Sequence, residues 1–450
     1  MKNIINILIF ILVSFSVKAQ EIPNLETFTL KNGLKVYFLK YGKIKAMHVK
    51  LIVNSGKKNE PPGQQGYNSI TANLVLQGNK KYTEEQQNDL AFTIGADLKS
   101  ESDKDRTYIS GNFLSKDASL VFDLMSAAVL QPLFDKDKLA QFISYMSDYN
   151  KPSKMNITQM AQVYSNLSLY GLDNPLGRTI YKEQLNLISS EKLKEFHAFN
   201  YTPKNTKVLV CGNFESVEVK ALIEKYFGAW ESTYGEVNGV SLDMPIIKKC
   251  DIYFANRLAA TQCALQWNFI APTQKSKEAM AFEIANMIFN TVLFKEIREK
   301  GGKTYGISST HQTSQFSNLM AVFCSVRSNE ALNTINLFDK TLENFSKAGF
   351  TQEDFDIELI RFKTNLLRME YPEEIANYFD PIEYDFNTRK KILDEVNKLK
   401  LVDIQKVVKK YYTPGVYKLV LAGDESILET QLSGIKGLKR YSPNDLKPAN

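Results

Sequence analysis

The sequence predicts an α+β protein built from two homologous domains, each a mainly antiparallel sheet packed with helices, joined by a linker. The chain has 450 residues, 44% of them hydrophobic and 24% charged, a globular composition with enough apolar residues for two cores. It also contains an internal repeat. "YTPKNTKVLVCGN" begins at Tyr201, "YTPGVYKLVLAGD" begins at Tyr412, and each follows an amphipathic helical pattern. A unit of helix, proline turn, apolar strand and glycine turn that occurs twice indicates two copies of one domain.

The two halves also begin with similar elements. "ETFTLKNGLKVYFLK" alternates apolar and polar residues about Asn32-Gly33, which predicts a hairpin with a type I′ turn. "AMHVKLIVNSG" predicts a strand before a helix, and in the second half "IYFANRLAATQCALQWNFIAP" predicts two strands before a helix. Segment 229–250 contains Gly and Pro and has little periodicity, which predicts the linker. We therefore expect domains at residues 24–235 and 250–440.

The first residues have the pattern of a secretory signal peptide. Lys2 precedes the apolar run "IINILIFILVSFSV", and small residues precede a cleavage position after Ala19. This run is shorter than the roughly 20 residues that a membrane-spanning helix needs. We therefore expect residues 1–19 to be removed, leaving an exported protein, periplasmic or secreted, with no membrane span. An uncleaved membrane anchor remains the alternative.

Charge and cysteine spacing argue against two function classes. The formal charge is +6, from 56 basic and 50 acidic residues spread along the chain, which is not the basic patch of a nucleic-acid-binding protein. The four cysteines form no C-x-x-C pair and no zinc-ribbon pattern, and two of them lie in apolar strand-like runs, which predicts buried thiols. A disulfide after export stays open for Cys211, Cys250, Cys263 and Cys324.

The stretch "REKGGKTYG" at 298–306 contains Gly-Gly-Lys-Thr, the tail of a phosphate-binding loop. The first glycine of that loop would fall on Ile297, and the stretch follows a helical pattern and precedes a strand, which is the reverse of a P-loop. A nucleotide site is therefore excluded. The stretch also fits a helix C-terminus, with Arg298 and Lys300 in the last turn and Gly301 in the left-handed position. That reading leaves Arg298 and Tyr305 separated by one tight turn, where both side chains could point into the same cleft.

The stretch that begins "SGKKNEPPGQQGYNSITANLVLQGNKKYTEEQ" resembles the insulinase/pitrilysin-like peptidases, the inverted-motif zinc family that includes mitochondrial processing peptidase. Ser55-Gly56, Glu60, Gly66 and Gly78 keep the family's frame, and "GADLKSESDKDRTYISG" matches its following strand pair. The resemblance continues through "LYGLDNPLGRTIYKEQ" and covers most of the mature chain. It implies the family's two-domain fold.

The family's zinc chemistry does not fit these residues. In this frame the first His falls on Ser69, the Glu on Ala72 and the second His on Asn73. Ser and Asn are poor zinc ligands and Ala cannot accept a proton. The third ligand would fall within "SYMSDYN", which offers Asp148 but no Glu. We therefore expect no metal or other cofactor in this chain.

The histidines support the same expectation. The chain has three, His48, His197 and His311, and no two of them have the i, i+4 spacing of a helical ligand pair. Each is therefore expected to be an ordinary strand or helix residue.

"LFKEIREKGGKTYGISS" resembles the family motif L-F-x-x-[IL]-R-E-x-x-G-L-[AT]-Y-x-[VI]-S-S. Arg298 and Tyr305 fall on the pair that the family uses to grip substrate near the scissile bond. The sequence differs from the family pattern at two points in or next to this motif. Lys303 replaces an apolar residue, and the preceding "ANMIFNTVLFKEIR" lacks the family's Gly-rich loop.

The resemblance implies the non-metal-binding subunit of a heterodimeric, exported zinc metalloendopeptidase. Its partner would be a similar-sized subunit with an intact zinc motif, and zinc would belong to that partner. Arg298 and Tyr305 would bind the peptide substrate and stabilise the tetrahedral intermediate in the partner's active site. The alternative is a catalytically inactive scaffold or peptide-binding protein of the same fold, which the missing Gly-rich loop and Lys303 favour.

Overall fold

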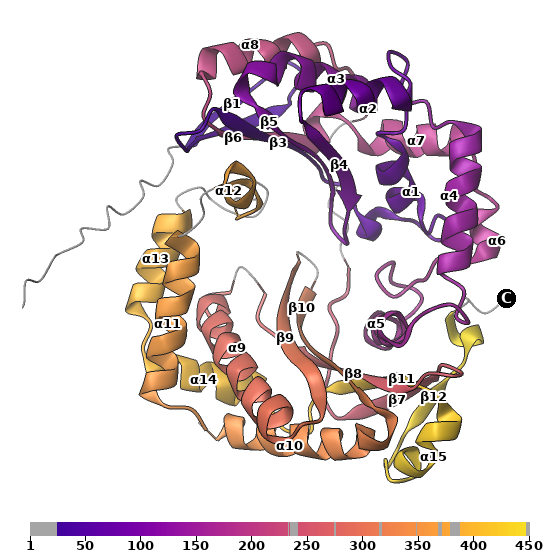
Figure 1. Cartoon of the computed structure of the whole chain (residues 1–450), viewed down its shortest axis with the longest axis vertical. Helices are drawn as coiled ribbons and strands as arrows, with labels where there is room; N and C mark the ends of the chain where they lie inside the picture. Colours follow the sequence, from indigo (N-terminus) through magenta and orange to yellow (C-terminus); the bar gives the residue numbers. More distant parts are fainter. Residues whose placement is uncertain are drawn as a thin grey trace, which may run out of the picture.

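The computed structural model describes residues 25–232, 234, 242–273, 276–314, 317–347, 349–367, 371–378 and 388–446. The predicted signal peptide, residues 1–19, lies outside the described residues, as does part of the predicted linker. Two six-stranded sheets lie opposite each other, each with helices on its outer face (Figure 1). This arrangement confirms the predicted α+β class and its two homologous domains. Within the described ranges, every helix is too short or too polar to cross a bilayer.

The first sheet has the order β1-β2-β6-β3-β5-β4. Its neighbours are antiparallel except β2 and β6, which are parallel. Helices α2, α3 and α8 lie on the outer face, and α1, α4, α6 and α7 form a group beside β4 (Figure 1). The strands are β1 (Leu25–Thr29), β2 (Lys35–Lys40), β3 (Ala46–Val53), β4 (Asp97–Ser102), β5 (Thr107–Leu114) and β6 (Thr206–Gly212). The helices are α1 (Tyr67–Leu74), α2 (Glu84–Thr93), α3 (Ala118–Leu130), α4 (Lys136–Tyr149), α6 (Lys182–Leu185), α7 (Ser190–Asn200) and α8 (Ser216–Phe227).

The second sheet repeats this plan in the order β12-β7-β11-β8-β10-β9. The strand after each Tyr-Thr-Pro turn, β6 or β11, occupies the same position in its sheet and follows an equivalent helix, α7 or α14. The edge position is filled differently, by the first strand β1 in one sheet and by the last strand β12 in the other. The strands are β7 (Asp251–Asn256), β8 (Gln262–Ile270), β9 (Thr304–Ser314), β10 (Ser317–Arg327), β11 (Lys418–Gly423) and β12 (Lys439–Tyr441). The helices are α9 (Ala279–Leu293), α10 (Ala331–Ser346), α11 (Gln352–Leu367), α13 (Thr388–Lys398), α14 (Leu401–Tyr411) and α15 (Glu425–Ser433).

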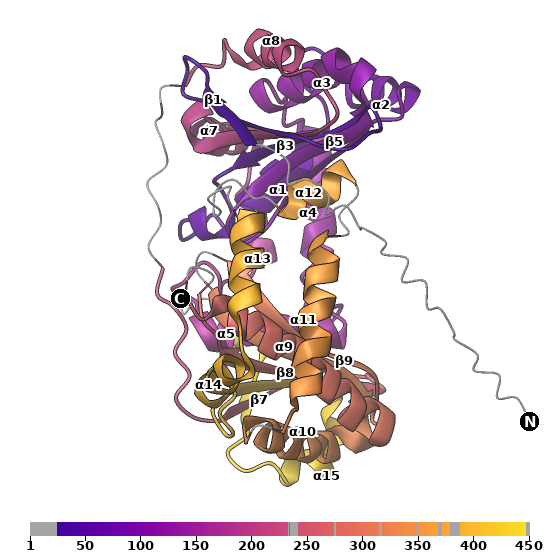
Figure 2. The ribbon, with the colours of Figure 1, turned by 90° about the vertical axis from the view of Figure 1, so that its left-hand side faces the viewer.

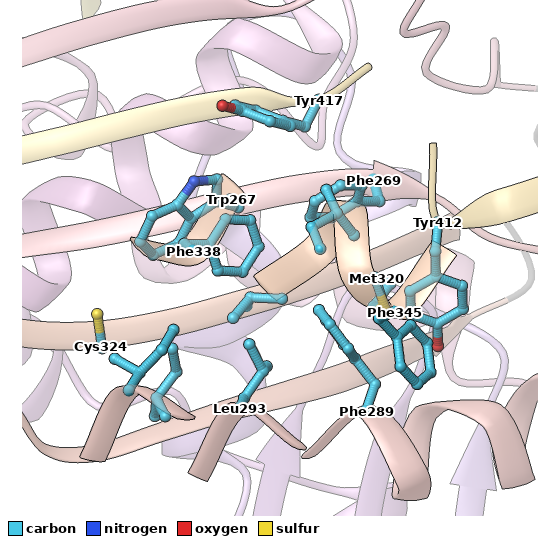
Figure 3. Packing of buried hydrophobic residues seen from close by; sticks show 14 of the residues in the cluster. Trp267, Phe269, Phe289, Leu293, Met320, Cys324, Phe338, Phe345, Tyr412 and Tyr417 are labelled. Carbon is cyan, nitrogen blue, oxygen red and sulfur yellow. The ribbon is translucent and has the colours of Figure 1, made fainter. Parts of the chain in front are cut away.

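Aromatic side chains fill the core of the second domain (Figure 3). Trp267 of β8 stacks on Phe338 of α10 with ring centroids 4.2 Å apart, and both side chains are fully buried. Phe289 and Leu293 of α9 point into the same cluster (Figure 3). This face of α9 therefore packs in the core, and the opposite face of the helix lies outside the core.

The predicted hairpin forms, but its turn differs from the prediction. β1 and β2 pair from Leu25↔Leu39 to Thr29↔Lys35, so the connection spans residues 30–34 rather than two residues. Gly33 has φ +93°, whereas Asn32 is not left-handed, so a type I′ turn was wrong. The Asn32 amide instead donates hydrogen bonds to the carbonyl of Phe227, the last residue of α8 (2.8 Å), and to that of Trp230 just beyond it (3.1 Å). This tertiary contact selects the longer loop.

Each sheet is covered on its inner face by a helix from the other half, an exchange that the sequence did not predict. α5 (Ile157–Tyr170) of the first half packs Met160 and Tyr164 against the second sheet at Ala264 and Ala422. α12 (Pro372–Tyr378) of the second half covers the first sheet (Figures 1 and 2). There α12 contributes Ile375 and Ala376 to a cluster with Leu39, Ile52, Leu209 and Cys211.

The four cysteines carry free thiols in the structure. Cys211, Cys263 and Cys324 are buried, as predicted, and Cys250 is half-buried. Burial raises the pKa of the Cys211 and Cys263 thiols to about 12, so neither is poised as a thiolate.

Replacing Phe338 by Ala is expected to destabilise the protein by about 3–5 kcal/mol, because it removes a buried ring and leaves a cavity against Trp267. Chemical denaturation followed by tryptophan fluorescence measures the change. The matched control is Phe92→Ala on α2, whose side chain is 86% exposed, and it should change the unfolding free energy little. Equal effects of the two variants would contradict the packing described.

Candidate functional site

Helix α1 carries Ser69, Ala72 and Asn73, the positions that align with the family's zinc motif, which we call the zinc frame. A buried carboxylate anchors the N-terminus of this helix. Glu60 is only 4% exposed, and its Oε1 accepts hydrogen bonds from the backbone N–H groups of Gly66 (3.1 Å) and Asn68 (2.9 Å). A carboxylate there satisfies donors that a helix N-terminus leaves unpaired. Burial nevertheless raises the pKa of Glu60 to about 7, although these hydrogen bonds and the charge of Lys57 favour the ionised form.

Two basic residues hold the segment around Glu60. The Arg178 guanidinium donates hydrogen bonds to the carbonyls of Glu60 (3.1 Å), Leu172 (2.9 Å) and Asp173 (2.5 Å). The Lys57 ammonium donates to the carbonyls of Leu176 and Arg178, and burial lowers its pKa to about 8. The Pro-x-Gly-Arg run noted in the sequence is therefore part of the scaffold behind α1.

The face of α1 where zinc ligands would stand is occupied by unsuitable side chains. The Ser69 hydroxyl donates to the Gly66 carbonyl at 3.1 Å within its own helix turn. Ala72 is buried, and the Asn73 side-chain carbonyl accepts a hydrogen bond from Gln77 at 2.9 Å. A hydroxyl and an amide are weak ligands for zinc compared with imidazole or thiolate. These residues do not fit a zinc ion.

The segment expected to hold a third ligand packs beside α1. Phe142, Ile143 and Met146 of α4 join the small core around α1. Asp148 on the same helix is engaged by Lys151 at 2.9 Å and by Lys154. Hydrogen bonds from these two lysines lower the pKa of Asp148. Its charge is thus balanced by lysines.

The three histidines lie in separate elements, β3, α7 and β9. His48 shares a 2.8 Å hydrogen bond with Asn112, and His197 is buried against Phe134, where desolvation lowers its pKa to about 4. His311 shares a 3.0 Å hydrogen bond with the Pro272 carbonyl. In the described part of the chain, no three His, Cys, Asp or Glu residues are grouped so that they could hold a metal ion.

The second candidate segment begins where α9 changes into a π-helical turn, η4 (Phe294–Lys300). The Gly301 N–H donates to the Glu296 carbonyl at 3.1 Å, five residues back, so this turn holds one residue more than an α-helical turn. The left-handed residue that ends the helix is Gly302, with φ +61°, whereas Gly301 has φ −78°. The prediction of Gly301 at this position was therefore wrong by one residue, because the widened turn moves the end of the helix forward.

Arg298 and Tyr305 lie on either side of this helix end. The Arg298 guanidinium lies 4.4 Å from the ring centroid of Phe294, one turn earlier. Phe294 was not noted in the sequence, although its i, i+4 spacing to Arg298 is the spacing at which such pairs meet. Neither the Arg298 nor the Tyr305 side chain forms a hydrogen bond or ion pair with the described residues.

Tyr305 is held at an irregularity in the second sheet. Thr304 pairs with Val326 and Ile307 pairs with Cys324, so β9 has one extra residue between these pairs. Such a bulge redirects side chains, and Tyr305 is 87% exposed. Lys303, the departure from the motif, forms a 2.7 Å ion pair with Glu330 within its own half.

The two candidate segments belong to different halves of the molecule. α1 and α4 lie beside the first sheet, whereas η4 and β9 belong to the second (Figure 1). A hydrogen bond of 3.1 Å from Lys104, between β4 and β5, to Gln312 of β9 connects the halves.

Comparison with known families agrees with this division. A family model described as "Insulinase (Peptidase family M16)" matches residues 38–181, and a model described as "Peptidase M16 inactive domain" matches residues 187–360. The chain belongs to the insulinase (M16) peptidase family. The first match contains the altered zinc frame, and the second contains Arg298 and Tyr305.

Several M16 relatives are similar over most of this chain. An uncharacterised zinc protease, YmxG of Bacillus subtilis, is 18% identical over 390 residues, which cover 85% of this chain and 94% of that protein. The solved peptidase M16 inactive domain from Pseudomonas fluorescens has a TM-score of 0.81 at 20% identity and covers 89% of this chain and 98% of that one. The periplasmic protease PqqL of Escherichia coli has a TM-score of 0.69 at 14% identity, covering 94% of this chain and 49% of that one. This chain thus spans about half the length of that protease. At these identities the two structural similarities establish the fold alone.

Replacing Glu60 by Gln tests the buried carboxyl. Folding raises its pKa from 4.5 to about 7, so the folded state keeps a proton that the unfolded state loses between these values. The stability of the wild-type protein therefore loses roughly 3 kcal/mol from this residue as the pH rises through that window. Gln cannot ionise and keeps an acceptor oxygen for Gly66 and Asn68. The difference in Tm between the variant and the wild type should therefore shift in favour of the variant between pH 4.5 and pH 8.

The buried histidines do not obscure this comparison. Burial lowers the pKa values of His48 and His197, so their contribution makes the protein more stable as the pH rises towards about 6.5. This trend is opposite to that of Glu60. The wild type and the variant both contain these histidines, so the effect cancels in the comparison. The difference between the two proteins reports the ionisation of Glu60 together with its effect on the neighbouring Lys57, whose pKa the Glu60 charge raises. A Tm difference that does not vary with pH would contradict the raised pKa.

Proposed function

We propose that this chain is the subunit without a metal site in a two-chain, exported zinc endopeptidase of the M16 family. A similar-sized partner chain would carry the intact zinc motif, and Arg298 and Tyr305 would act on a peptide held in the partner's site. The observation that supports this proposal is a contrast between the halves. The residues in the zinc frame are unsuitable as ligands, while Arg298 and Tyr305 stand at the surface without a polar partner among the described residues.

The chemistry of these two groups suits such a role. Peptide hydrolysis places negative charge on the carbonyl oxygen of the scissile bond, and a positioned guanidinium or phenol stabilises that charge. Stacking on Phe294 limits the motion of the Arg298 guanidinium without using any of its N–H donors. The bulge at Tyr305 exposes its hydroxyl in the same way. Both groups therefore remain available to a substrate.

Export is part of the proposal. It rests on the N-terminal sequence pattern and is supported by the similarity to PqqL, which is named a periplasmic protease.

The alternative is a catalytically inactive scaffold or a peptide-binding protein of the same fold. Two features favour it. α9 runs directly into η4, with no Gly-rich loop before the Arg298 segment, and Lys303 stands where the motif has an apolar residue. Substrate contacts made by such a loop in relatives would then be missing. The two functions are distinguished by whether Arg298 and Tyr305 affect catalysis by a complex.

Substitutions in the assembled complex test the proposal. With a partner that has an intact zinc motif, Arg298→Ala and Tyr305→Phe are each expected to lower kcat/KM about 10²–10³-fold, the usual effect of removing an oxyanion donor. Lys300→Ala is the matched control for charge, because Lys300 is an exposed cation in the same turn that already pairs with Glu296. Tyr234→Phe is the control for loss of an exposed phenol.

Both controls should leave kcat/KM unchanged. An intact complex in which Arg298→Ala and Tyr305→Phe also leave it unchanged would rule out the catalytic role and favour the scaffold.

The metal content of the purified complex provides a second test. Zinc is expected at one ion per partner chain and absent from this chain purified alone, since Ser69, Ala72 and Asn73 supply no suitable ligand. Elemental analysis of both samples measures this. Stoichiometric zinc in this chain alone would contradict the assignment of the metal to the partner.

A further inference from the structure

The turn that connects Arg298 to Tyr305 contains two consecutive glycines, Gly301 and Gly302. Glycine restricts the backbone less than any other residue. The chain between η4 and β9 therefore does not by itself fix where Arg298 lies relative to Tyr305. Their relative position depends on the contacts that the rest of the structure makes with this turn.

Helix α10 packs against the first of the two glycines. A Cβ atom at Gly301 would lie 2.9 Å from Cδ2 of Leu337 on α10 and 2.7 Å from the carbonyl oxygen of Ile297, which is closer than ordinary van der Waals contact in both cases. Gly301 has an ordinary φ of −78°, so this close approach, and not the backbone conformation, accounts for the glycine. Helix α10 thus forms one wall of the turn.

Lys303 connects the turn to the same helix by an ion pair. Its Nζ lies 2.7 Å from Oε2 of Glu330, the residue that immediately precedes α10. Both side chains are 26% exposed, and hydrogen bonds from Lys303 and Asn333 lower the pKa of Glu330, which keeps the carboxylate ionised. Lys303 is also the residue that departs from the family motif, which has an apolar side chain at this position. The ion pair is therefore a contact that the family pattern does not specify.

The residues on either side of the Lys303 side chain are held by neighbouring elements. The Lys303 N–H donates to the carbonyl of Ile297 in η4 at 3.2 Å, and Ile297 is fully buried. The Thr304 hydroxyl donates to the Ser325 carbonyl of β10 at 2.7 Å and accepts from the Gly306 N–H at 3.2 Å. Contacts from α10, η4 and β10 thus converge on the few residues that separate the two candidate side chains.

We propose that Lys303 and Glu330 are positioning residues that fix Arg298 relative to Tyr305. The inference rests on the proposed function and adds to it the contact that holds its two groups in place. The lysine then has a purpose in this chain, because it links the flexible turn to the start of α10. A displacement of about 1 Å at a site of reaction can cost about 10²-fold in rate. A contact with little effect on stability can therefore have a large effect on catalysis.

Amide hydrogen exchange of the purified chain, without any partner, tests the link itself. Glu330→Ala removes the ion pair and leaves the sequence of residues 298–306 unchanged, so the intrinsic exchange rates of the turn stay the same. The amides of Gly302 and Lys303, both hydrogen-bonded to η4, are expected to exchange at least about threefold faster. Asn333→Ala removes a second hydrogen-bond partner of Glu330 outside the turn and is the control, which should leave these rates unchanged. Unchanged exchange in Glu330→Ala would overturn the proposal.

Kinetics of the two-chain complex test the consequence. Lys303→Met keeps an aliphatic side chain but removes the charge, and it is expected to lower kcat about tenfold with KM unchanged, because the groups that it positions act in the transition state. Its Tm should change by no more than about 2 °C, since a partly exposed ion pair contributes little to stability. The exchanged pair, Lys303→Glu with Glu330→Lys, should recover most of kcat, and a loss that it does not recover would contradict the proposal. Lys300→Ala, which removes an ion pair with Glu296 within η4, is the control and should leave kcat unchanged.

Comparison with Arg298→Ala separates this inference from the proposed function. If Arg298→Ala lowers kcat and Lys303→Met does not, the positioning role fails and the catalytic role stands. If neither variant changes kcat while Glu330→Ala still accelerates exchange in the turn, the catalytic role fails and the link that fixes the turn stands.

Discussion

The fold depends on covering the inner face of each sheet. β6, β8 and β11 are buried along nearly their whole length, which requires apolar cover on both faces. On the inner faces this cover is exchanged: α5 crosses to the second sheet and α12 crosses to the first. Polar contacts fix the exchange, including the hydrogen bond from Asn112 of β5 to Glu373 of α12 at 2.8 Å. Neither half can bury its sheet without a helix from the other, so the relative position of α1 and η4 follows from this requirement.

The two candidate segments, around α1 and around η4, differ in how much they contribute to the stability of the fold. Glu60 and Arg178 are buried and hold α1 in place, so this framework keeps its structural purpose without any metal. Arg298 and Tyr305 are exposed and contribute little to packing. A π-helical turn and a β-bulge, both local departures from regular geometry, present them at the surface. Such departures are often found at functional sites, although η4 also contributes the fully buried Ile297 to the core.

Sequence periodicity predicted the parts of the fold that depend on local patterns. The repeat at Tyr201 and Tyr412, the strand after Gly302 and the helix before it all form as expected. The sequence could not predict the exchange of α5 and α12, because it depends on contacts between residues distant in the chain. It also missed the turn at Asn32, where a tertiary hydrogen bond overrides the local preference, and the extra residue in η4. At the candidate site, resemblance pointed to Arg298 and Tyr305, whereas the ion pair of Lys303 with Glu330 depends on how β9 and β10 bring the start of α10 back to the turn.

Because α12 of the second half covers the first sheet, burial of the first sheet can be completed only late in synthesis. During synthesis the strands of the first sheet are complete at Gly212, but α12, which seals their inner face, begins only at Pro372. Between these points the nascent protein exposes an apolar sheet surface with no native cover available from its own N-terminal half. Such surfaces promote aggregation of partly made multidomain proteins. The architecture thus favours holding the chain unfolded until synthesis is finished, which is also the state in which a polypeptide is threaded through a narrow export channel.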